Sequence, residues 1–169
     1  MGSDRIDSLA FSPNGLFLVN SIKNCLHLWD FNNRKEITNR EKINSLKHQS
    51  RIFSVAFSPN SQLLASVSSN SIKLWDMIAK EEYIIEKNYS SFVSPIAFSP
   101  DGKTIAASYK SPVTGGSDRY ELGLWDIETK KETVIPNYFD SNFSSVAFSP
   151  NGEFLATGSR EGKICLWKA

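Results

Sequence analysis

Residues 9–15 read LAFSPNG, and this phrase recurs three more times along the chain. It returns as VAFSPNS at 55–61, as IAFSPDG at 96–102 and as VAFSPNG at 146–152. Successive copies begin roughly 40 to 50 residues apart, which is the period of a repeated supersecondary unit joined by loops of unequal length. The chain is therefore built from four copies of one small structure.

A second phrase follows each copy and ends in Leu-Trp. The tryptophans are Trp29, Trp75, Trp125 and Trp167, and the chain contains no others. Around both phrases, β-branched and aromatic residues alternate with small and polar ones, and no helical period is sustained. Each repeat is thus predicted to be made of strands.

The second repeat predicts a four-stranded antiparallel sheet. Its first strand carries apolar anchors at Ile52, Val55 and Phe57, and the three-residue step at its start predicts a β-bulge. A tight turn follows at 58–61, in which proline fixes φ and Asn60 is expected to take the left-handed conformation. Further strands are expected at 63–66, 72–75 and, as a more polar edge, near 82–85.

One such sheet cannot bury both of its faces, but several sheets packed in series can. The sequence therefore predicts an all-β fold, a β-propeller of four blades with about 15 antiparallel strands. We expect one domain over 1–169, with blades at about 6–40, 48–87, 92–136 and 143–168.

The paired phrases AFSP[ND]G and LWD resemble the WD-repeat (WD40) family over essentially the whole chain. Their wording is similar to the repeats of bacterial members. The resemblance implies WD-type blades and a non-catalytic surface that binds other proteins.

The resemblance also implies a buried polar set in each blade, made of a His, a Ser or Thr, an Asp and the Trp. In the second repeat His48, Ser66 and Trp75 match three of these roles, and Ser69 or Asn70 stands at the Asp position. Because the other repeats match less well, we expect packing to hold the blades more than hydrogen bonds do.

The fourth repeat offers only three strands, and four blades is the low end of the propeller range. Two alternatives stay open: a compact four-bladed ring, or a partial ring. A partial ring would be completed by self-association as a homodimer or by further blades.

Composition excludes several classes of function. Lys plus Arg number 19 and Asp plus Glu number 18, for a net charge of +1, so the basic excess of a nucleic-acid binder is missing. No apolar stretch approaches the roughly 20 residues needed to cross a bilayer. Two cysteines do not make a disulfide framework. We expect a cytoplasmic protein with neither nucleic-acid nor membrane partners.

The sequence shows no catalytic constellation. His27 and His48 are the only histidines, and both read as structural residues of a blade. There is no Cys or His cluster with zinc spacing and no Gly-rich phosphate loop. We therefore expect no enzyme activity, no metal and no cofactor; a propeller enzyme is the least favoured alternative.

The family resemblance places partner binding on the face formed by the start of each first strand and the turn between the second and third strands. Aromatic and arginine side chains there have the composition of interface hot spots. The third repeat adds a long expected loop at 110–119. The candidate partner-binding residues are Arg51, Phe53, Phe92, Tyr109, Lys110, Arg119 and Arg160.

Two hypotheses of function remain beside the enzyme alternative. The first is a scaffold that binds a partner protein or peptide on this face. The second is a half-propeller whose main role is structural and which forms a larger ring as a homodimer.

Overall fold

The computed structural model describes residues 5–37, 46–86, 91–111, 119–135 and 142–169. These residues form two compact units, Met1–Glu86 and Lys87–Ala169, which we describe separately. Each unit contains two antiparallel sheets, and each sheet corresponds to one repeat of the sequence. The expectation of a single domain, with the blade limits given above, stays a prediction.

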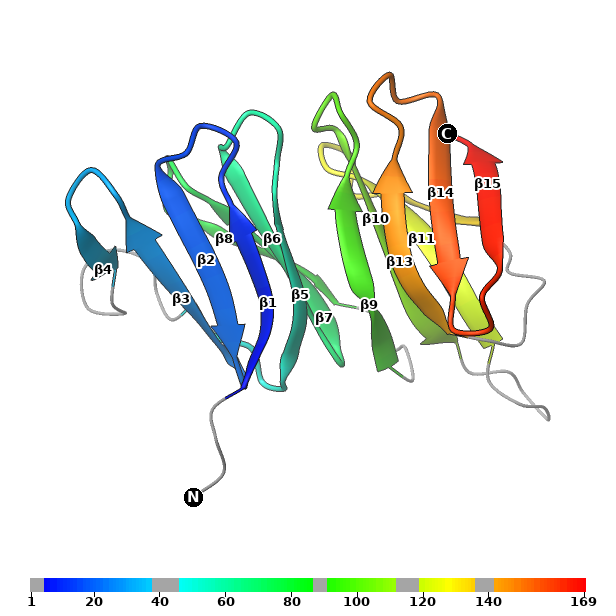
Figure 1. Ribbon diagram of the computed structural model, residues 1–169, viewed down its shortest axis with the longest axis horizontal. Coiled ribbons are helices and arrows are strands. Elements are labelled where there is room, and N and C mark those ends of the chain that lie inside the picture. Colours follow the sequence, from blue (N-terminus) through cyan, green and yellow to red (C-terminus); the bar gives the residue numbers. More distant parts are fainter. Residues whose placement is uncertain (1–4, 38–45, 87–90, 112–118, 136–141) are drawn as a thin grey trace. The chain divides into compact units, whose positions relative to one another are not determined.

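The first unit contains two four-stranded sheets (Figure 1). The first sheet pairs β1 (Ile6–Phe11), β2 (Phe17–Ile22), β3 (Cys25–Asp30) and β4 (Lys35–Ile37) in that order. The second sheet pairs β5 (Ile52–Phe57), β6 (Leu63–Ser68), β7 (Ser71–Asp76) and β8 (Glu82–Glu86) in the same order.

The second unit contains one four-stranded and one three-stranded sheet. The first consists of β9 (Ser91–Phe98), β10 (Thr104–Ser111), β11 (Arg119–Asp126) and β12 (Glu132–Ile135). The second consists of β13 (Phe143–Phe148), β14 (Phe154–Ser159) and β15 (Ile164–Lys168). The all-β prediction and the 15 antiparallel strands are confirmed for the residues that the structure describes.

One boundary differs from the sequence prediction. The loop was expected at 110–119, but the ladder between β10 and β11 continues through Lys110↔Tyr120 to Ser111↔Arg119. The backbone at both ends of the expected loop is therefore strand, because cross-strand pairing lengthens the hairpin beyond its apolar core. The remainder, 112–118, lies outside the described residues.

The predicted β-bulge is confirmed, and it recurs. The register between first and second strands shifts between Ile52 and Ser54 in β5, between Ile6 and Ser8 in β1, and between Phe143 and Ser145 in β13. A bulge adds a residue to one strand and increases its twist. The bulge therefore changes the direction of the side chains at the start of the first strand, next to candidate binding residues such as Arg51 and Phe53.

The recurring Ser-Pro-Asn/Asp-Gly turn is held by its own side chains. In the second repeat the Ser58 hydroxyl donates to Asn60 Oδ1 at 2.7 Å and accepts from the Leu63 amide at 2.9 Å. The left-handed residue is not Asn60, as expected, but the next one, Ser61, with φ of 62°. Glycine fills that position in the other three copies, because it takes positive φ without a Cβ penalty.

Replacing Ser58 with Ala should lower the free energy of unfolding by about 1.5 kcal/mol, because Ser58 is fully buried and its partners would lose a hydrogen bond. Urea denaturation of the whole chain measures this change. The matched control is Ser149→Ala, which removes the same bonds from an exposed copy of the turn. Water can replace them there, so equal losses at the two sites would contradict this account.

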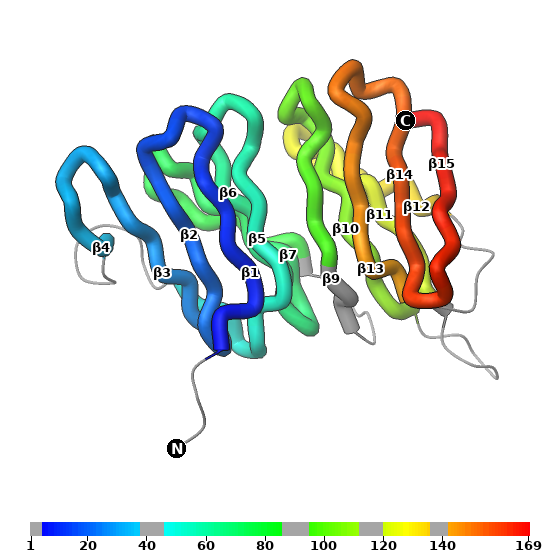
Figure 2. The backbone as a smooth tube through the Cα atoms, in the orientation of Figure 1, coloured from blue at the N-terminus to red at the C-terminus, as the bar shows by residue number. Residues whose placement is uncertain are grey.

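Each unit has its own apolar core. In the first unit Val19 and Leu28 of the first sheet cluster with Phe57, Leu64 and Trp75 of the second. In the second unit Ala106 and Leu122 of β10 and β11 cluster with Phe143 and Leu155 of β13 and β14. In each unit the two sheets also bring their first strands together, β1 with β5 and β9 with β13, as Figure 2 shows.

The segment that precedes β5 is bonded to the first sheet. The Leu26 amide donates to the Leu46 carbonyl at 2.8 Å, and the His48 amide donates to the Asn24 carbonyl at 2.9 Å. An isolated bridge joins Cys25 and Lys47 between these two bonds. The first sheet thereby fixes the segment that carries His48 into the second sheet.

Candidate partner-binding surface

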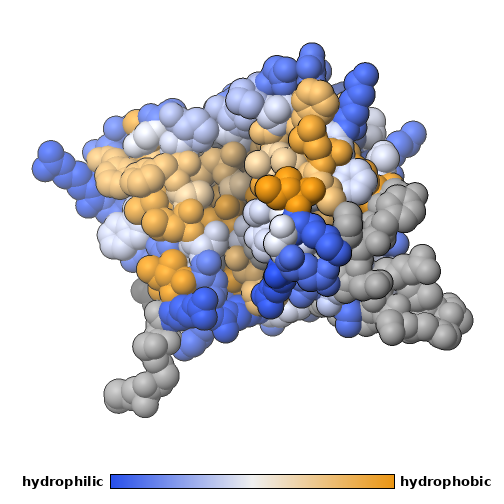
Figure 3. Space-filling model, turned by 45° about the vertical axis from the view of Figure 1, so that its right-hand side comes forward, coloured by the Kyte–Doolittle hydropathy of each residue, from blue (hydrophilic) through white to orange (hydrophobic). Residues whose placement is uncertain are grey.

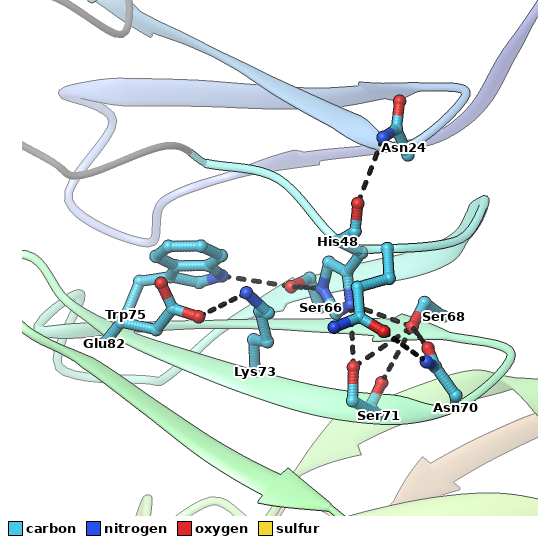
Figure 4. A network of polar contacts seen from close by, with 10 residues as sticks. Asn24, His48, Ser66, Ser68, Asn70, Ser71, Lys73, Trp75 and Glu82 are labelled. Carbon is cyan, nitrogen blue, oxygen red and sulfur yellow. Dashed lines mark hydrogen bonds and ion pairs between the residues drawn. The ribbon is translucent and has the colours of Figure 1, made fainter.

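A buried polar network underlies the start of β5 (Figure 4). The indole Nε1 of Trp75 donates to the Ser66 hydroxyl at 3.0 Å, and that hydroxyl lies 2.7 Å from Nε2 of His48. On the other side of the ring, Nδ1 lies 2.8 Å from the Ser68 hydroxyl and 3.1 Å from that of Ser71. All five side chains are buried, so this network ties together β6, β7 and the segment before β5.

One proton assignment accounts for the hydrogen bonds that link Trp75, Ser66, His48 and Ser68. The Trp75 indole can only donate, so Ser66 accepts from it and donates to Nε2 of His48. Nδ1 then carries the proton and donates to Ser68, whose hydroxyl donates to Asn70 Oδ1 at 3.0 Å. The imidazole is neutral in this arrangement.

The electrostatics agree with a neutral His48. Burial, and after it the positive charge of Lys73, lower the pKa of His48 to about 3. Among the residues that the structure describes, no carboxylate is bonded to the ring, and Glu82 is paired with Lys73. The network is therefore a set of neutral hydrogen bonds that holds local structure.

The sequence expectation for this network was partly wrong. It placed Ser69 or Asn70 in the role of the family's Asp, but Ser68 and Ser71 contact the imidazole. The turn between β6 and β7 holds only residues 69 and 70, so the hydroxyls at its two ends, Ser68 and Ser71, reach the ring. The second sheet thus has an extensive polar network, and the expectation that packing holds the blades more than hydrogen bonds do stays a prediction.

The other sheets retain less of this network. In the fourth repeat Trp167 Nε1 donates to the Thr157 hydroxyl at 3.1 Å. In the third repeat Ala107 occupies the position of Ser66 and offers no hydroxyl. The second repeat therefore has the most complete network among the described residues.

Above the network, the start of β5 displays Arg51. Its guanidinium donates from Nε and Nη2 to the two carboxylate oxygens of Asp7, at 2.7 and 2.6 Å. This bond, together with the charge of Arg51, lowers the pKa of Asp7, and Asp7 in turn raises the pKa of Arg51. Half of the Arg51 side chain stays exposed, so the group is both oriented and accessible.

Polar side chains surround Arg51 on the adjoining turn. The Ser50 hydroxyl donates to Asn70 Oδ1 at 3.1 Å and accepts from the Ser69 amide at 3.2 Å. The Asn70 amide donates to Gln49 Oε1 at 3.4 Å. Phe53 follows on β5 and is half-buried, so part of its ring is available at this edge. We call residues 49–51, Phe53, Ser69 and Asn70 the β5 rim.

The second unit places the remaining candidates differently. Tyr109 is 1% exposed and packs on Trp125 with ring centroids 5.9 Å apart, so its side chain belongs to the core. Lys110 is half-buried, and Arg160 is exposed at the turn after β14, where its amide donates to the Asn142 carbonyl at 3.2 Å. The side chains of Phe92 and Arg119 lie outside the described part of the structure.

Sequence reasoning missed the role of Asp7 and correctly placed His27 on a strand. Asp7 directly follows the first apolar anchor of β1, and Arg51 directly precedes the corresponding anchor, Ile52, of the next repeat; the signal for their pairing was the opposite charge of these two flanking residues. His27 is half-exposed and lies 2.6 Å from Glu36 through Nδ1.

In the part of the chain that the structure describes, no three His, Cys, Asp or Glu side chains gather as metal ligands would. Cys25 and Cys165 are free and half-buried. The described residues also include no helix that is both apolar and long enough to cross a membrane.

The structure combines four antiparallel sheets, a recurring turn, a recurring tryptophan and, in the second sheet, a His–Ser–Trp network. The family model "WD domain, G-beta repeat" matches residues 40–76 and 131–168, which contain the second and fourth tryptophans. The chain belongs to the WD-repeat family. Its sheets are WD-type blades, which confirms the predicted propeller-blade architecture. No curated protein matches the chain.

Proposed function

We propose that this WD-repeat protein is a non-catalytic scaffold that binds a partner protein or peptide. The observation that carries the proposal is the β5 rim, where Asp7 orients the half-exposed Arg51 two residues before Phe53. WD-repeat blades generally serve as such interaction surfaces. The bidentate pair with Asp7 pre-orders Arg51, which reduces the entropy lost when a partner is bound.

In the second unit we propose Lys110 and Arg160 as further contact residues. Arg160 is exposed at the turn that corresponds to Ser69 and Asn70 of the β5 rim. Phe92 and Arg119 stay predictions, and Tyr109 is left out because it is buried. The two free cysteines support a cytoplasmic setting, where thiols are kept reduced.

The test uses peptides selected from a random library on the intact protein. Replacing Arg51 and Phe53 together with Ala should weaken the binding of the selected peptides at least about tenfold, because both groups would be hot-spot contacts. Titration calorimetry measures the affinity, and circular dichroism checks that the blades stay folded.

The matched control is Lys80→Ala. Lys80 is exposed at the turn that follows β7, at the opposite end of the same sheet. It removes one positive charge, as Arg51→Ala does, and should leave the affinity unchanged. Peptides that bind the double variant as well as the native chain would refute the proposed surface.

A further inference from the structure

Each blade has two faces that can be followed from repeat to repeat. Neighbouring residues of a strand point to opposite faces of the sheet. The tryptophan face carries the Trp of the third strand, and the leucine face carries the Leu just before it. The third strands are β3, β7, β11 and β15.

The two units show the same packing of these faces. In the first unit the leucine face of the first blade, with Val19, Leu26 and Leu28, clusters with Phe57 and Trp75 on the tryptophan face of the second. In the second unit the leucine face of the third blade meets the tryptophan face of the fourth: Ala106, Leu122 and Leu124 cluster with Phe148, Leu155 and Trp167. Within this chain, a leucine face is what covers a tryptophan face.

The first blade leaves its tryptophan face uncovered. Phe11 is 61% exposed and Trp29 is 44% exposed. The corresponding residues of the second blade, Phe57 and Trp75, are 8% and 0% exposed. The difference does not come from the residue types, which are the same, but from the lack of a covering sheet.

The fourth blade leaves its leucine face uncovered. Ile164 is 82% exposed and Leu166 is 65% exposed, whereas the corresponding Leu26 and Leu28 of the first blade are 5% and 0% exposed. Figure 3 shows that apolar side chains gather at the surface of the molecule. Apolar patches of this kind mark association surfaces.

The uncovered tryptophan face also has a place for apolar side chains. Leu18, Trp29 and Phe31 line a hollow of about 380 Å³, with Arg34 and Lys35 at its margin. Leucine-face side chains such as Ile164 and Leu166 have the chemistry that fills such a hollow. Within the first unit, the Ser8 hydroxyl of β1 accepts a hydrogen bond from the Val55 amide of the next blade at 3.1 Å. In the fourth blade, Ser145 of β13 stands at the position of Ser8.

We propose that a second copy of this chain covers both faces: the leucine face of the fourth blade of each copy docks on the tryptophan face of the first blade of the other. The repeated packing within the two units identifies the occupant, since the chain itself supplies the only kind of surface seen to cover a tryptophan face in the described residues. Two such contacts close a dimer, and its blades number about 8, within the range of propellers. The dimer contact is separate from the β5 rim.

Light scattering on the purified 169-residue chain tests the dimer, with an expected mass of twice 18.9 kDa. Two variants each disable one face: Leu9→Lys on the tryptophan face, where Leu9 is 58% exposed, and Ile164→Lys on the leucine face. Each variant alone should be monomeric, because every contact then includes one charged face. Circular dichroism is expected to be unchanged, because both side chains are exposed.

Mixing the two variants distinguishes this arrangement from others. A mixture contains one intact pair of faces, so a heterodimer weaker than the native dimer should form. Three results would overturn the proposal: a native chain with the mass of a monomer, either variant remaining a dimer, or a mixture that stays monomeric. A measured mass greater than that of a dimer would overturn the proposal that two copies close the assembly.

Discussion

Lowering the pH from 7 to 5 should reduce the free energy of unfolding by about 2 kcal/mol. The ordinary pKa of a histidine side chain is 6.5, and that of His48 in the folded chain is about 3. As the pH falls below 6.5, the unfolded chain binds a proton at this position and the folded chain does not. Stability is therefore unaffected above that value and lost progressively toward pH 3.

Urea denaturation at several pH values measures this slope, with His48→Gln as the control. Glutamine keeps a hydrogen-bonding side chain but does not titrate, so the variant should lose the slope. The carboxyl groups of Asp7 and Asp101 have pKa values lowered below 3.8, so they titrate outside the window. Equal slopes for the native chain and the variant would show that His48 is not the group responsible.

Replacing Gly123 with Ala should lower the free energy of unfolding by about 3 kcal/mol. A Cβ atom at Gly123 would lie 2.6 Å from Cζ2 of Trp125 and 2.9 Å from Oε1 of Glu132. Trp125 is 1% exposed, and its large ring cannot move aside without disturbing Tyr109, on which it packs. Overpacking of a buried site costs typically about 1–3 kcal/mol, and this site is at the upper end.

Gly158→Ala is the matched control for Gly123→Ala, because both glycines lie in strands and neither has positive φ. A Cβ at Gly158 would meet the Ser145 hydroxyl at 2.5 Å, and this small group can rotate away. The loss there should stay below about 1 kcal/mol. Equal losses in thermal denaturation would mean that the backbone, and not the Trp125 ring, sets the cost at Gly123.

Gly123 also explains how the third blade manages without the polar network. Its place in the repeat is taken by Lys73 in the second blade, and Ala107 stands where Ser66 would offer a hydroxyl. The Trp125 ring lies over the bare backbone of Gly123. In the third blade, Ala107 and Gly123 thus make room for the tryptophan. In the second blade, Ser66 and Lys73 occupy the same two positions and contact the tryptophan.

The repeat made most of the fold predictable. The two phrases predict the number of strands, the bulge at the start of β5 and a tryptophan in each third strand, and the structure confirms all three for the described residues. These features depend on period and residue type, which a single chain displays four times. The same signal could have placed Tyr109 in the core, because residues two apart in a strand share a face, and Tyr109 thus lies on the same face of β10 as Ile105 and Ala107.

The details of the polar surface were less predictable. The contacts of His48 with Ser68 and Ser71 depend on the length of one turn, and the pairing of Arg51 with Asp7 joins residues from two repeats. Such contacts depend on how neighbouring blades approach one another, which residue spacing within one repeat does not encode. The left-handed conformation was expected at Asn60 but occurs at the next residue, Ser61. The reason is local, because the Asn60 side chain accepts a hydrogen bond from the Gln62 amide.

The bonds between the segment at 46–48 and β3 govern how the first unit comes apart. Leu46 and His48 belong to the second repeat by sequence but complete hydrogen bonds of the first blade. Melting the first blade would therefore release the imidazole on which Ser66 and Trp75 depend, and the second blade would follow. In a repeat protein stability is a sum of unit and neighbour contributions, and these hydrogen bonds between residues 46–48 and the first blade belong to the neighbour contribution. The first two blades should behave as one cooperative folding unit, although each has its own sheet.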